Sequence, residues 1–252
     1  ALQVEWDKLR NQGAWDLESV REMSELKAEY RAKGKVAHFG IVFSICHKKH
    51  AETAPEHWKY KGRVVFQGNQ VRTESNQQAM FSEQGTSANH HTSGKWLDAL
   101  GRLPGNHGQD SDAVSAYTQA TLEGDDIWGC LPRDQWPTGK IAQNKGWNKF
   151  YNPCVKLKLA LYGHPLAGLY WENHCKTALS KCGFEPVPAW ECLHFNKTKG
   201  LFLSVYVDDF KLSGPKENLP KAWQNIRKHI ATGEPEPLRH FLGCTYESVW
   251  VT

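Results

Sequence analysis

Two adjacent carboxylates, Asp208 and Asp209, stand where an apolar segment of the chain ends. The run over residues 201–207 predicts a strand buried on at least one face, and a shorter run follows at residues 211–214. The two carboxylates therefore lie at the expected tip of a hairpin. Aspartate is a common turn residue, so a solvated turn is one interpretation. A metal site is the other, because two like charges at the end of a buried strand repel unless a cation neutralises them.

A third carboxylate, Asp112, could complete such a metal site. It lies in residues 110–117, which we expect to contain a short strand, and Tyr117 follows it five residues later. Two divalent ions held by carboxylates are the chemistry of phosphoryl transfer. Asp110 is a rival for this role, but it lacks an aromatic residue at the same spacing. The other acidic pair, residues 125–126, lacks a preceding apolar strand, and we interpret it as an acidic turn.

Two cations, Lys61 and Arg63, alternate with other residues in the predicted strand 60–67, so both should project from one face. A solvated strand face is one interpretation of this pair. The other is a clamp for a triphosphate, to which arginine offers bidentate hydrogen bonds and lysine a point charge. As a clamp, the two cations should face the carboxylates across a cleft.

These residues lie within motifs that resemble those of reverse transcriptases from copia-type LTR retrotransposons. Residues 206–209, Tyr-Val-Asp-Asp, resemble the metal-binding hairpin of that family. Residues 60–65, Tyr-Lys-Gly-Arg-Val-Val, resemble its Tyr-Lys-Ala-Arg-Leu-Val segment, which belongs to a hairpin that holds the incoming nucleotide. Asp112, Ala116 and Tyr117 match its Asp-x-x-x-Ala-aromatic segment.

Two further segments extend the resemblance toward the C-terminus. Residues 154–163 are similar to the family's Lys-Leu-x-Lys-Ala-Leu-Tyr-Gly, and Trp171 follows after the expected gap. Residues 241–244 resemble a Phe-Leu-Gly-Ile strand pair that grips the primer end. The resemblance runs from about Val4 to Glu247 in one order, and this ordered spacing carries it more than any single motif.

The resemblance implies an α+β fold, the fingers and palm of a right-hand polymerase. Fingers are expected at about residues 1–103 and 125–165. The palm, an antiparallel sheet backed by helices, is expected at about residues 104–124 and 166–252. We expect the chain to be a fragment of a Pol polyprotein, because it begins without Met and nothing in it resembles a thumb, ribonuclease H or integrase domain.

The resemblance also implies a role for each matched residue. Asp112 and Asp208 would bridge two Mg²⁺ ions, with Mn²⁺ as an alternative ion, and Asp209 would be a third catalytic carboxylate that adds charge or a further contact to the metals. The backbone carbonyl of Ala113 would complete the metal site. Tyr117 would exclude the ribonucleotide 2′-hydroxyl by its bulk. The nucleotide-binding residues would be Lys61, Arg63, Tyr117 and Leu166, and the primer grip would be Phe241, Leu242 and Gly243.

The implied function is that of an RNA-directed DNA polymerase, which transfers a nucleotidyl group from a dNTP to a primer 3′-hydroxyl. Its partners would be an RNA or DNA template with its primer, the dNTP and the remainder of Pol. Its location would be intracellular, in a cytoplasmic virus-like particle or in the nucleus. No run of eighteen apolar residues occurs, so we expect no membrane-spanning segment.

Several departures from the family keep a second hypothesis open. Leu166 stands where the family has a Gln that contacts nucleotide and template, the thumb is missing, and no obvious proton-donating Lys precedes Phe241. A catalytically inactive relic, which folds and at most binds nucleic acid, is therefore the alternative. A binding module with an ordinary acidic turn is a third hypothesis.

Apolar spacing outlines the elements that position these residues. A helix is expected over residues 16–33, with Ser19 and Glu22 as a capping box. The other predicted elements are strands at 41–46 and 60–67, helices over 86–102 and 167–182, and a helical face of Trp223, Ile226 and Ile230.

Composition bounds these hypotheses without deciding between them. The 252 residues suffice for one large domain or two small ones, and a net charge of +4 permits binding to a polyanion without demanding it. Seven cysteines without a disulfide-like spacing predict reduced thiols. The densest group, residues 174–194, lacks a Cys-x-x-Cys pair, so we expect buried structural cysteines there rather than a zinc site.

Overall fold

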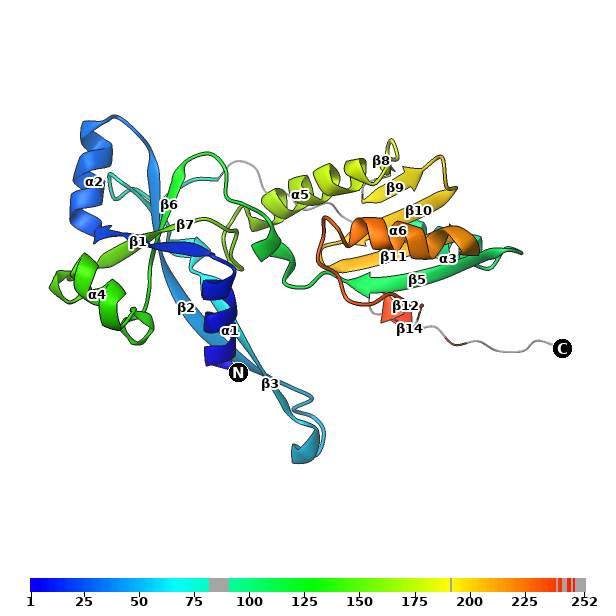
Figure 1. Cartoon of the computed structure of the whole chain (residues 1–252), viewed down its shortest axis with the longest axis horizontal. Coiled ribbons are helices and arrows are strands. Elements are labelled where there is room, and N and C mark those ends of the chain that lie inside the picture. Colours follow the sequence, from blue (N-terminus) through cyan, green and yellow to red (C-terminus); the bar gives the residue numbers. More distant parts are fainter. Residues whose placement is uncertain (82–90, 191, 239, 242–243, 246, 248–252) are drawn as a thin grey trace. The chain divides into compact units, whose positions relative to one another are not determined.

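The computed structural model contains both helices and sheets, arranged in two compact units (Figure 1). Unit 1 comprises residues 1–84 and 120–170, and unit 2 comprises residues 85–119 and 171–252. Within the described residues, no helix has the length and apolar character needed to cross a membrane. The structure describes residues 1–81, 91–190, 192–238, 240–241, 244–245 and 247.

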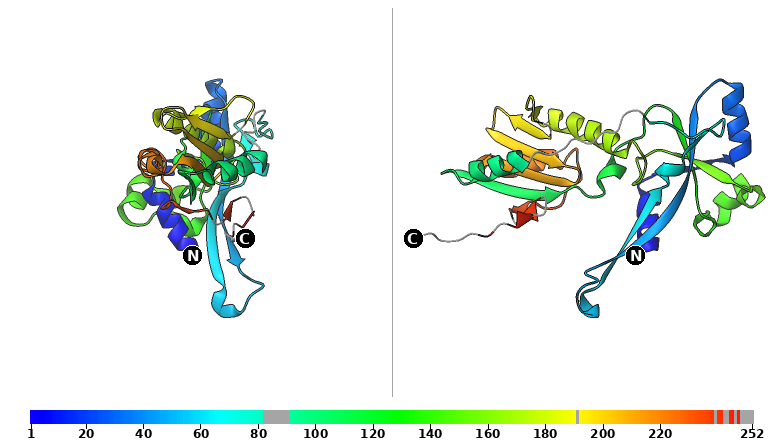
Figure 2. Two further views of the ribbon diagram at one scale, coloured as in Figure 1. Left: turned by 90° about the vertical axis from the view of Figure 1, so that its right-hand side faces the viewer. Right: turned by 180° about the vertical axis from the view of Figure 1, so that it is seen from behind.

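Unit 1 is built on one sheet with the strand order β1-β7-β6-β2-β3, to which β4 adds by pairing with β2. All of these pairs are antiparallel except β2 with β6. The hairpin of β2 and β3 extends well beyond the rest of the unit (Figures 1 and 2). The elements of unit 1 are α1 (Leu2–Asn11), β1 (Trp15–Glu22), α2 (Met23–Ala32), β2 (Ala37–Lys49), β3 (Lys59–Phe66), β4 (Arg72–Thr73), β6 (Asp126–Cys130), α4 (Gly139–Lys145) and β7 (Pro153–Leu157).

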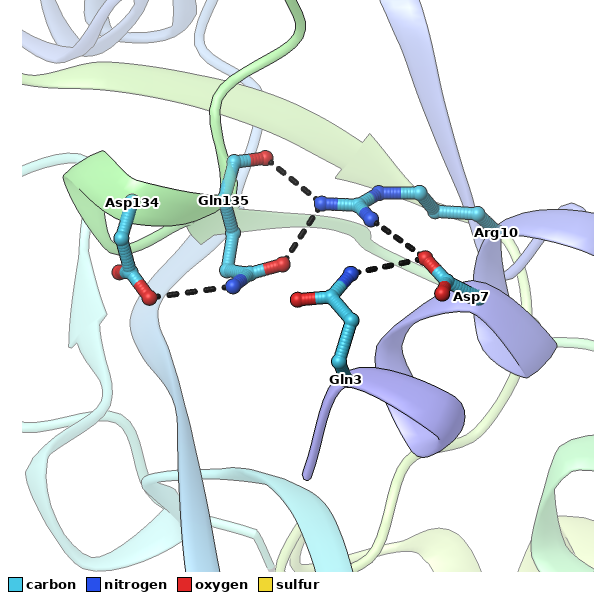
Figure 3. A network of polar contacts seen from close by, with 5 residues as sticks. All are labelled: Gln3, Asp7, Arg10, Asp134 and Gln135. Carbon is cyan, nitrogen blue, oxygen red and sulfur yellow. Dashed lines mark hydrogen bonds and ion pairs between the residues drawn. The ribbon is translucent and has the colours of Figure 1, made fainter. Parts of the chain in front are cut away.

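A polar network fastens α1 to the short 3₁₀ helix η4 (Arg133–Gln135) of the same unit (Figure 3). The Arg10 guanidinium donates to the backbone carbonyl of Gln135 at 3.1 Å and to its side-chain oxygen at 2.7 Å. Asp7 accepts a third bond from Arg10 at 3.0 Å. One planar guanidinium therefore joins two segments that lie 125 positions apart.

The prediction of one helix over residues 16–33 is wrong in its first half, where the structure has β1 before α2. The two expected capping residues hold the strand instead. Ser19 Oγ accepts a hydrogen bond from the backbone N–H of Lys156 at 2.8 Å, and the Glu22 carboxylate accepts from Asn152 N–H at 3.0 Å. Pairing with a strand 137 positions away thus outweighs local helical spacing.

The prediction that all thiols are reduced is also wrong for one pair, because Cys130 and Cys154 form a disulfide. The two residues face each other in register on β6 and β7, with Cα atoms 4.4 Å apart. Their separation of 24 positions gave no sign of this proximity, since it depends on which strands become neighbours.

Unit 2 is built on an antiparallel sheet of order β12-β5-β11-β10-β9-β8, with β13 and β14 as a separate small hairpin. Helix α5 begins in unit 1 and continues along this sheet (Figure 1). The elements of unit 2 are α3 (His91–Gly101), β5 (Asn106–Asp112), α5 (Ala167–Lys181), β8 (Glu185–Pro186), β9 (Leu193–Asn196), β10 (Leu201–Tyr206), β11 (Asp209–Pro215), α6 (Leu219–Ile226), β12 (Glu236–Pro237), β13 (His240–Phe241) and β14 (Cys244–Thr245).

The core of unit 2 lies between its sheet and the helices α5 and α6. Phe210 and Leu212 of β11 are fully buried there, together with Leu179 of α5 and Trp223 of α6. The predicted helix 167–182 is confirmed, and Trp223 and Ile226 are buried on α6 as expected; Ile230 is also buried but lies beyond the end of this helix. The predicted helix 86–102 is present as α3 from His91, while residues 86–90 lie outside the described part of the chain. Cys175 and Cys182 are buried, as expected.

A lysine is buried on the other face of the same strand. Lys211 alternates with Phe210 and Leu212, so its side chain points away from the core and toward α3. Its side chain is 0% exposed, it forms an ion pair with Asp98, and its ammonium donates to the carbonyl of Gly94 at 3.1 Å. The α3 helix is thereby tied to the centre of the sheet.

Lys211→Met should lower the free energy of unfolding by about 3 kcal/mol, because it leaves the Asp98 carboxylate without its cation. The matched control is Lys176→Met, which breaks an exposed ion pair with Glu172 and should cost about 0.5 kcal/mol or less. Urea unfolding of the two variants measures the difference. Equally small losses of unfolding free energy in the two variants would contradict a stabilising role for the buried Lys211–Asp98 ion pair.

Candidate active site

The two predicted hairpin carboxylates lie at a tight turn of unit 2. Strands β10 and β11 pair antiparallel up to the opposed residues Tyr206 and Asp209, which leaves only Val207 and Asp208 in the loop. Asp208 is exposed and Asp209 is partly buried. The hairpin expected from the sequence is therefore present, with one carboxylate in the turn and the next at the start of β11.

The third predicted carboxylate reaches the same place through strand pairing. Asp112 is the last residue of β5, and its partner in the register of β5 with β11 is Asp209. The backbone N–H of Ala113 donates to the carbonyl of Asp208 at 2.6 Å. The structure thus brings Asp112 together with Asp208 and Asp209, although Asp112 lies about a hundred positions before them in the sequence.

Electrostatic repulsion is concentrated on Asp209. Burial raises the pKa of its carboxyl to about 6, and the charges of Asp208 and Asp112, with a hydrogen bond to Asp112, act in the same direction. Direct carboxyl contact is therefore between Asp112 and Asp209. The expected metal bridge between Asp112 and Asp208 stays a prediction. A positive ion at this position would relieve the repulsion.

The carboxylates at this turn are ligands of the kind that magnesium prefers. In the part of the chain that the structure describes, no group of three or more His, Cys, Asp or Glu is arranged to hold a metal ion. Magnesium needs only one or two carboxylates and fills its other positions with water and substrate phosphates. Carboxylate oxygens at Asp112 and Asp208, both exposed, are donors of this kind. These residues fit Mg²⁺ shared with a phosphate-bearing substrate.

Tyr117 lies near these carboxylates, but not on a strand. It belongs to the 3₁₀ helix η3 (Ala116–Gln119), which follows Ser115 with its positive φ of 55°. Strand β5 therefore ends at Asp112, five residues before Tyr117. The half-buried ring packs against the core of unit 2, and burial, followed by the charges of Asp208 and Tyr206, raises the pKa of its hydroxyl.

The two predicted clamp residues lie in unit 1, on β3. Lys61 and Arg63 are both exposed, and as alternate residues they share a face of the β2–β3 hairpin. Their register partners on β2 are His47 and Ile45. The Arg63 guanidinium also lies over the ring of Tyr162, with 5.4 Å between its carbon and the ring centroid.

Leu166, also in unit 1, lines a cavity of about 240 Å³. Phe81 and Tyr170 contribute aromatic walls, and Asp125 lies at the same cavity. Asp126, its neighbour in the second acidic pair, is the first residue of β6 rather than part of the expected turn, and it forms an ion pair with Lys156.

The predicted primer-grip segment is described only in part. Phe241 is buried on β13, which pairs with β14, and the Lys211 ammonium lies 4.9 Å from its ring centroid. Leu242 and Gly243 lie outside the described residues.

Sequence reasoning missed one contact of the turn. Trp171, at the start of unit 2's part of α5, donates its indole N–H to the carbonyl of Val207 at 2.6 Å. In the sequence, only the position of Trp171 after the 154–163 motif marked this residue, and that position gave no indication that it contacts Val207.

The comparison with protein families shows the family of the chain. Residues 35–248 match the model of the family described as reverse transcriptase (RNA-dependent DNA polymerase). The match covers most of the chain, so the chain belongs to the reverse transcriptase family, whose members are nucleotidyltransferase enzymes.

Comparisons with individual proteins are less informative than the family match. No curated protein matches the chain. Among solved structures, a similar chain is the foamy viral protease–reverse transcriptase dRH in complex with double-stranded DNA, with 13% sequence identity and a TM-score of 0.36. The alignment covers 88% of this chain and 32% of the foamy viral chain, so this chain spans about a third of that protein's length.

Proposed function

We propose that the chain is the fingers and palm of a copia-type retrotransposon reverse transcriptase, with unit 1 as fingers and unit 2 as palm. This assignment moves residues 85–103 from the expected fingers to the palm, and residues 120–124 and 166–170 from the expected palm to the fingers. The observation that carries the proposal is the pairing of β5 with β11, which sets Asp112 opposite Asp209 beside the turn that contains Asp208. Family membership supports RNA-directed DNA synthesis as the reaction.

In the proposed mechanism each residue positions a reactant or balances its charge. Asp112 and Asp208, with the backbone carbonyl of Ala113, would hold two Mg²⁺ ions, or Mn²⁺ in their place. Bound metal would supply activation of the primer 3′-hydroxyl and neutralisation of the leaving pyrophosphate. Asp209 would add negative charge that favours cation binding. Without a bound cation the pKa of the Asp209 carboxyl is raised to about 6, so below that pH its protonation would compete with cation binding.

The other proposed contacts orient the substrates. Lys61 and Arg63 would hold the triphosphate of the dNTP, and Tyr117 would lie beneath its sugar. Leu166 would meet the nucleotide through packing alone, where a Gln would add hydrogen bonds. The Phe241 hairpin, with Leu242 and Gly243, would hold the primer end of an RNA or DNA template duplex.

Primer extension by the purified chain tests the proposal. Asp208→Asn should reduce extension by about a hundredfold or more, the scale on which one electrostatic group at a transition state contributes. Asp110→Asn, at the rival carboxylate, should retain most of the activity. Both variants should unfold at the parent's temperature. A parent that folds but never extends a primer would favour the inactive relic.

Arg63→Ala should raise the dNTP KM by about tenfold or more, because a hydrogen bond to a charged group contributes about 1.5–3 kcal/mol. Lys59→Ala is the matched control, since Lys59 is an exposed cation on the same face of β3. Steady-state kinetics at varied dNTP concentration measures both. Equal behaviour of the two variants would mean that the cations form a solvated face.

Tyr117→Val should raise ribonucleotide incorporation steeply while it lowers deoxynucleotide incorporation only modestly, because a ring that overlaps the 2′-hydroxyl discriminates by clash. Tyr117→Phe keeps the ring and should keep the selectivity. The ratio of kcat/KM for dNTP and rNTP is the measurement. If selectivity persists in a folded, active Tyr117→Val variant, the discrimination arises elsewhere.

A further inference from the structure

The turn that carries Asp208 adopts a backbone conformation that its sequence disfavours. Val207 has a φ of 53°, in the left-handed region. This region is readily adopted by glycine, whereas the side chain of a β-branched residue clashes with its own backbone there. Two-residue hairpin loops in which only the first position has a positive φ, as here, normally place glycine at it. Surrounding contacts must therefore hold Val207 in place.

Two hydrogen bonds hold the two carbonyl groups of this turn. The indole N–H of Trp171 donates to the Val207 carbonyl at 2.6 Å, and the backbone N–H of Ala113 donates to the Asp208 carbonyl at 2.6 Å. The first bond comes from α5 and the second from the residue after β5. Both peptide groups around the Asp208 Cα are thus fixed, and with them the direction of its side chain.

The Trp171 side chain is itself rigidly held. It is 3% exposed and belongs to the core of unit 2, among residues of α5, α6 and the sheet. Its ring is stacked on that of His174, with centroids 5.7 Å apart and planes inclined by 19°. A buried indole with fixed neighbours loses little freedom when it donates its N–H, so it is well suited to hold a strained turn.

We propose that Trp171 is a positioning residue for the reaction: its N–H holds the Val207 carbonyl and so keeps the Asp208 carboxylate beside Asp112. This inference rests on the proposed function, because it assigns Asp208 to the chemistry. Trp171 acts only through the turn. A shift of about 1 Å in a catalytic group can cost about a hundredfold in rate, so a single hydrogen bond to the turn is enough to matter.

Trp171→Phe tests this, since it keeps an aromatic ring and removes only the donor and the second ring. Trp223→Phe is the matched control: Trp223 is 2% exposed in the same core, and its indole N–H donates to Gln109 Oε1 at 3.0 Å, away from the turn. Both variants lose one buried indole bond. Their losses of thermal stability should therefore be similar.

Three readouts separate positioning from a general structural role. Trp171→Phe should speed amide hydrogen exchange at residues 207–209, lower the extension rate per folded molecule by about tenfold or more, and raise the Mg²⁺ concentration for half-maximal rate. Trp223→Phe should change none of these. The proposal is overturned if the two variants have the same amide exchange rates at the turn and the same primer-extension rate. It is also overturned if exchange at the turn speeds up in Trp171→Phe with no change in the primer-extension rate.

A second substitution tests the link to backbone strain. Glycine holds a positive φ without a steric penalty, so Val207→Gly should lessen the effect of losing the indole bond. The double variant Trp171→Phe/Val207→Gly should then exchange more slowly at the turn than Trp171→Phe, and it should recover part of the rate. Additive losses would contradict this link. If the parent never extends a primer, the proposed function fails, and hydrogen exchange alone decides whether Trp171 holds the turn.

Discussion

The register between β5 and β11 is the constraint on which the candidate site depends. In this register Asp112 is opposite Asp209, and a slip of one residue would move every side chain of the strand to the other face. Burial on both faces prevents that slip. Phe210 would leave the apolar core, and the Lys211 ammonium would enter it without Asp98. Ordinary packing thus sustains a contact between carboxylates that repel each other.

The raised pKa of Asp209, caused first by burial and then by that repulsion, has a stability consequence with a definite sign. A carboxyl whose pKa is raised on folding is harder to ionise in the folded chain than in the unfolded one. For Asp209, raised to about 6, the cost to folding is absent at low pH and grows as pH rises from the unfolded-state pKa toward 6. Site formation is therefore opposed by electrostatics near neutral pH and maintained by the hydrophobic core beneath it.

Local patterns predicted the elements whose own residues determine them. The hairpin at Asp208 and the helix 167–182 follow from apolar runs and a stopping glycine, Gly183, whose φ is +80°. Features that depend on distant partners were not predictable. One is strand β1, which forms by pairing with β7. The others are the Cys130–Cys154 disulfide and the turn that places Tyr117 on a 3₁₀ helix. Predicting the direct contact of Asp112 with Asp209 would have required the register of β5 with β11, which a single sequence does not reveal.

The interleaving of the two units along the chain bears on the order in which they can fold. In unit 1, β1 pairs with β7, joining Trp15 to Leu157, so the first strand has no partner on that edge until the intervening part of unit 2 has been made. In unit 2, β5 likewise waits for β11. Such long-range closures slow folding and leave strand edges exposed on the ribosome. Synthesis of this chain therefore passes through intermediates in which both sheets are incomplete, and chaperone protection would have its greatest effect there.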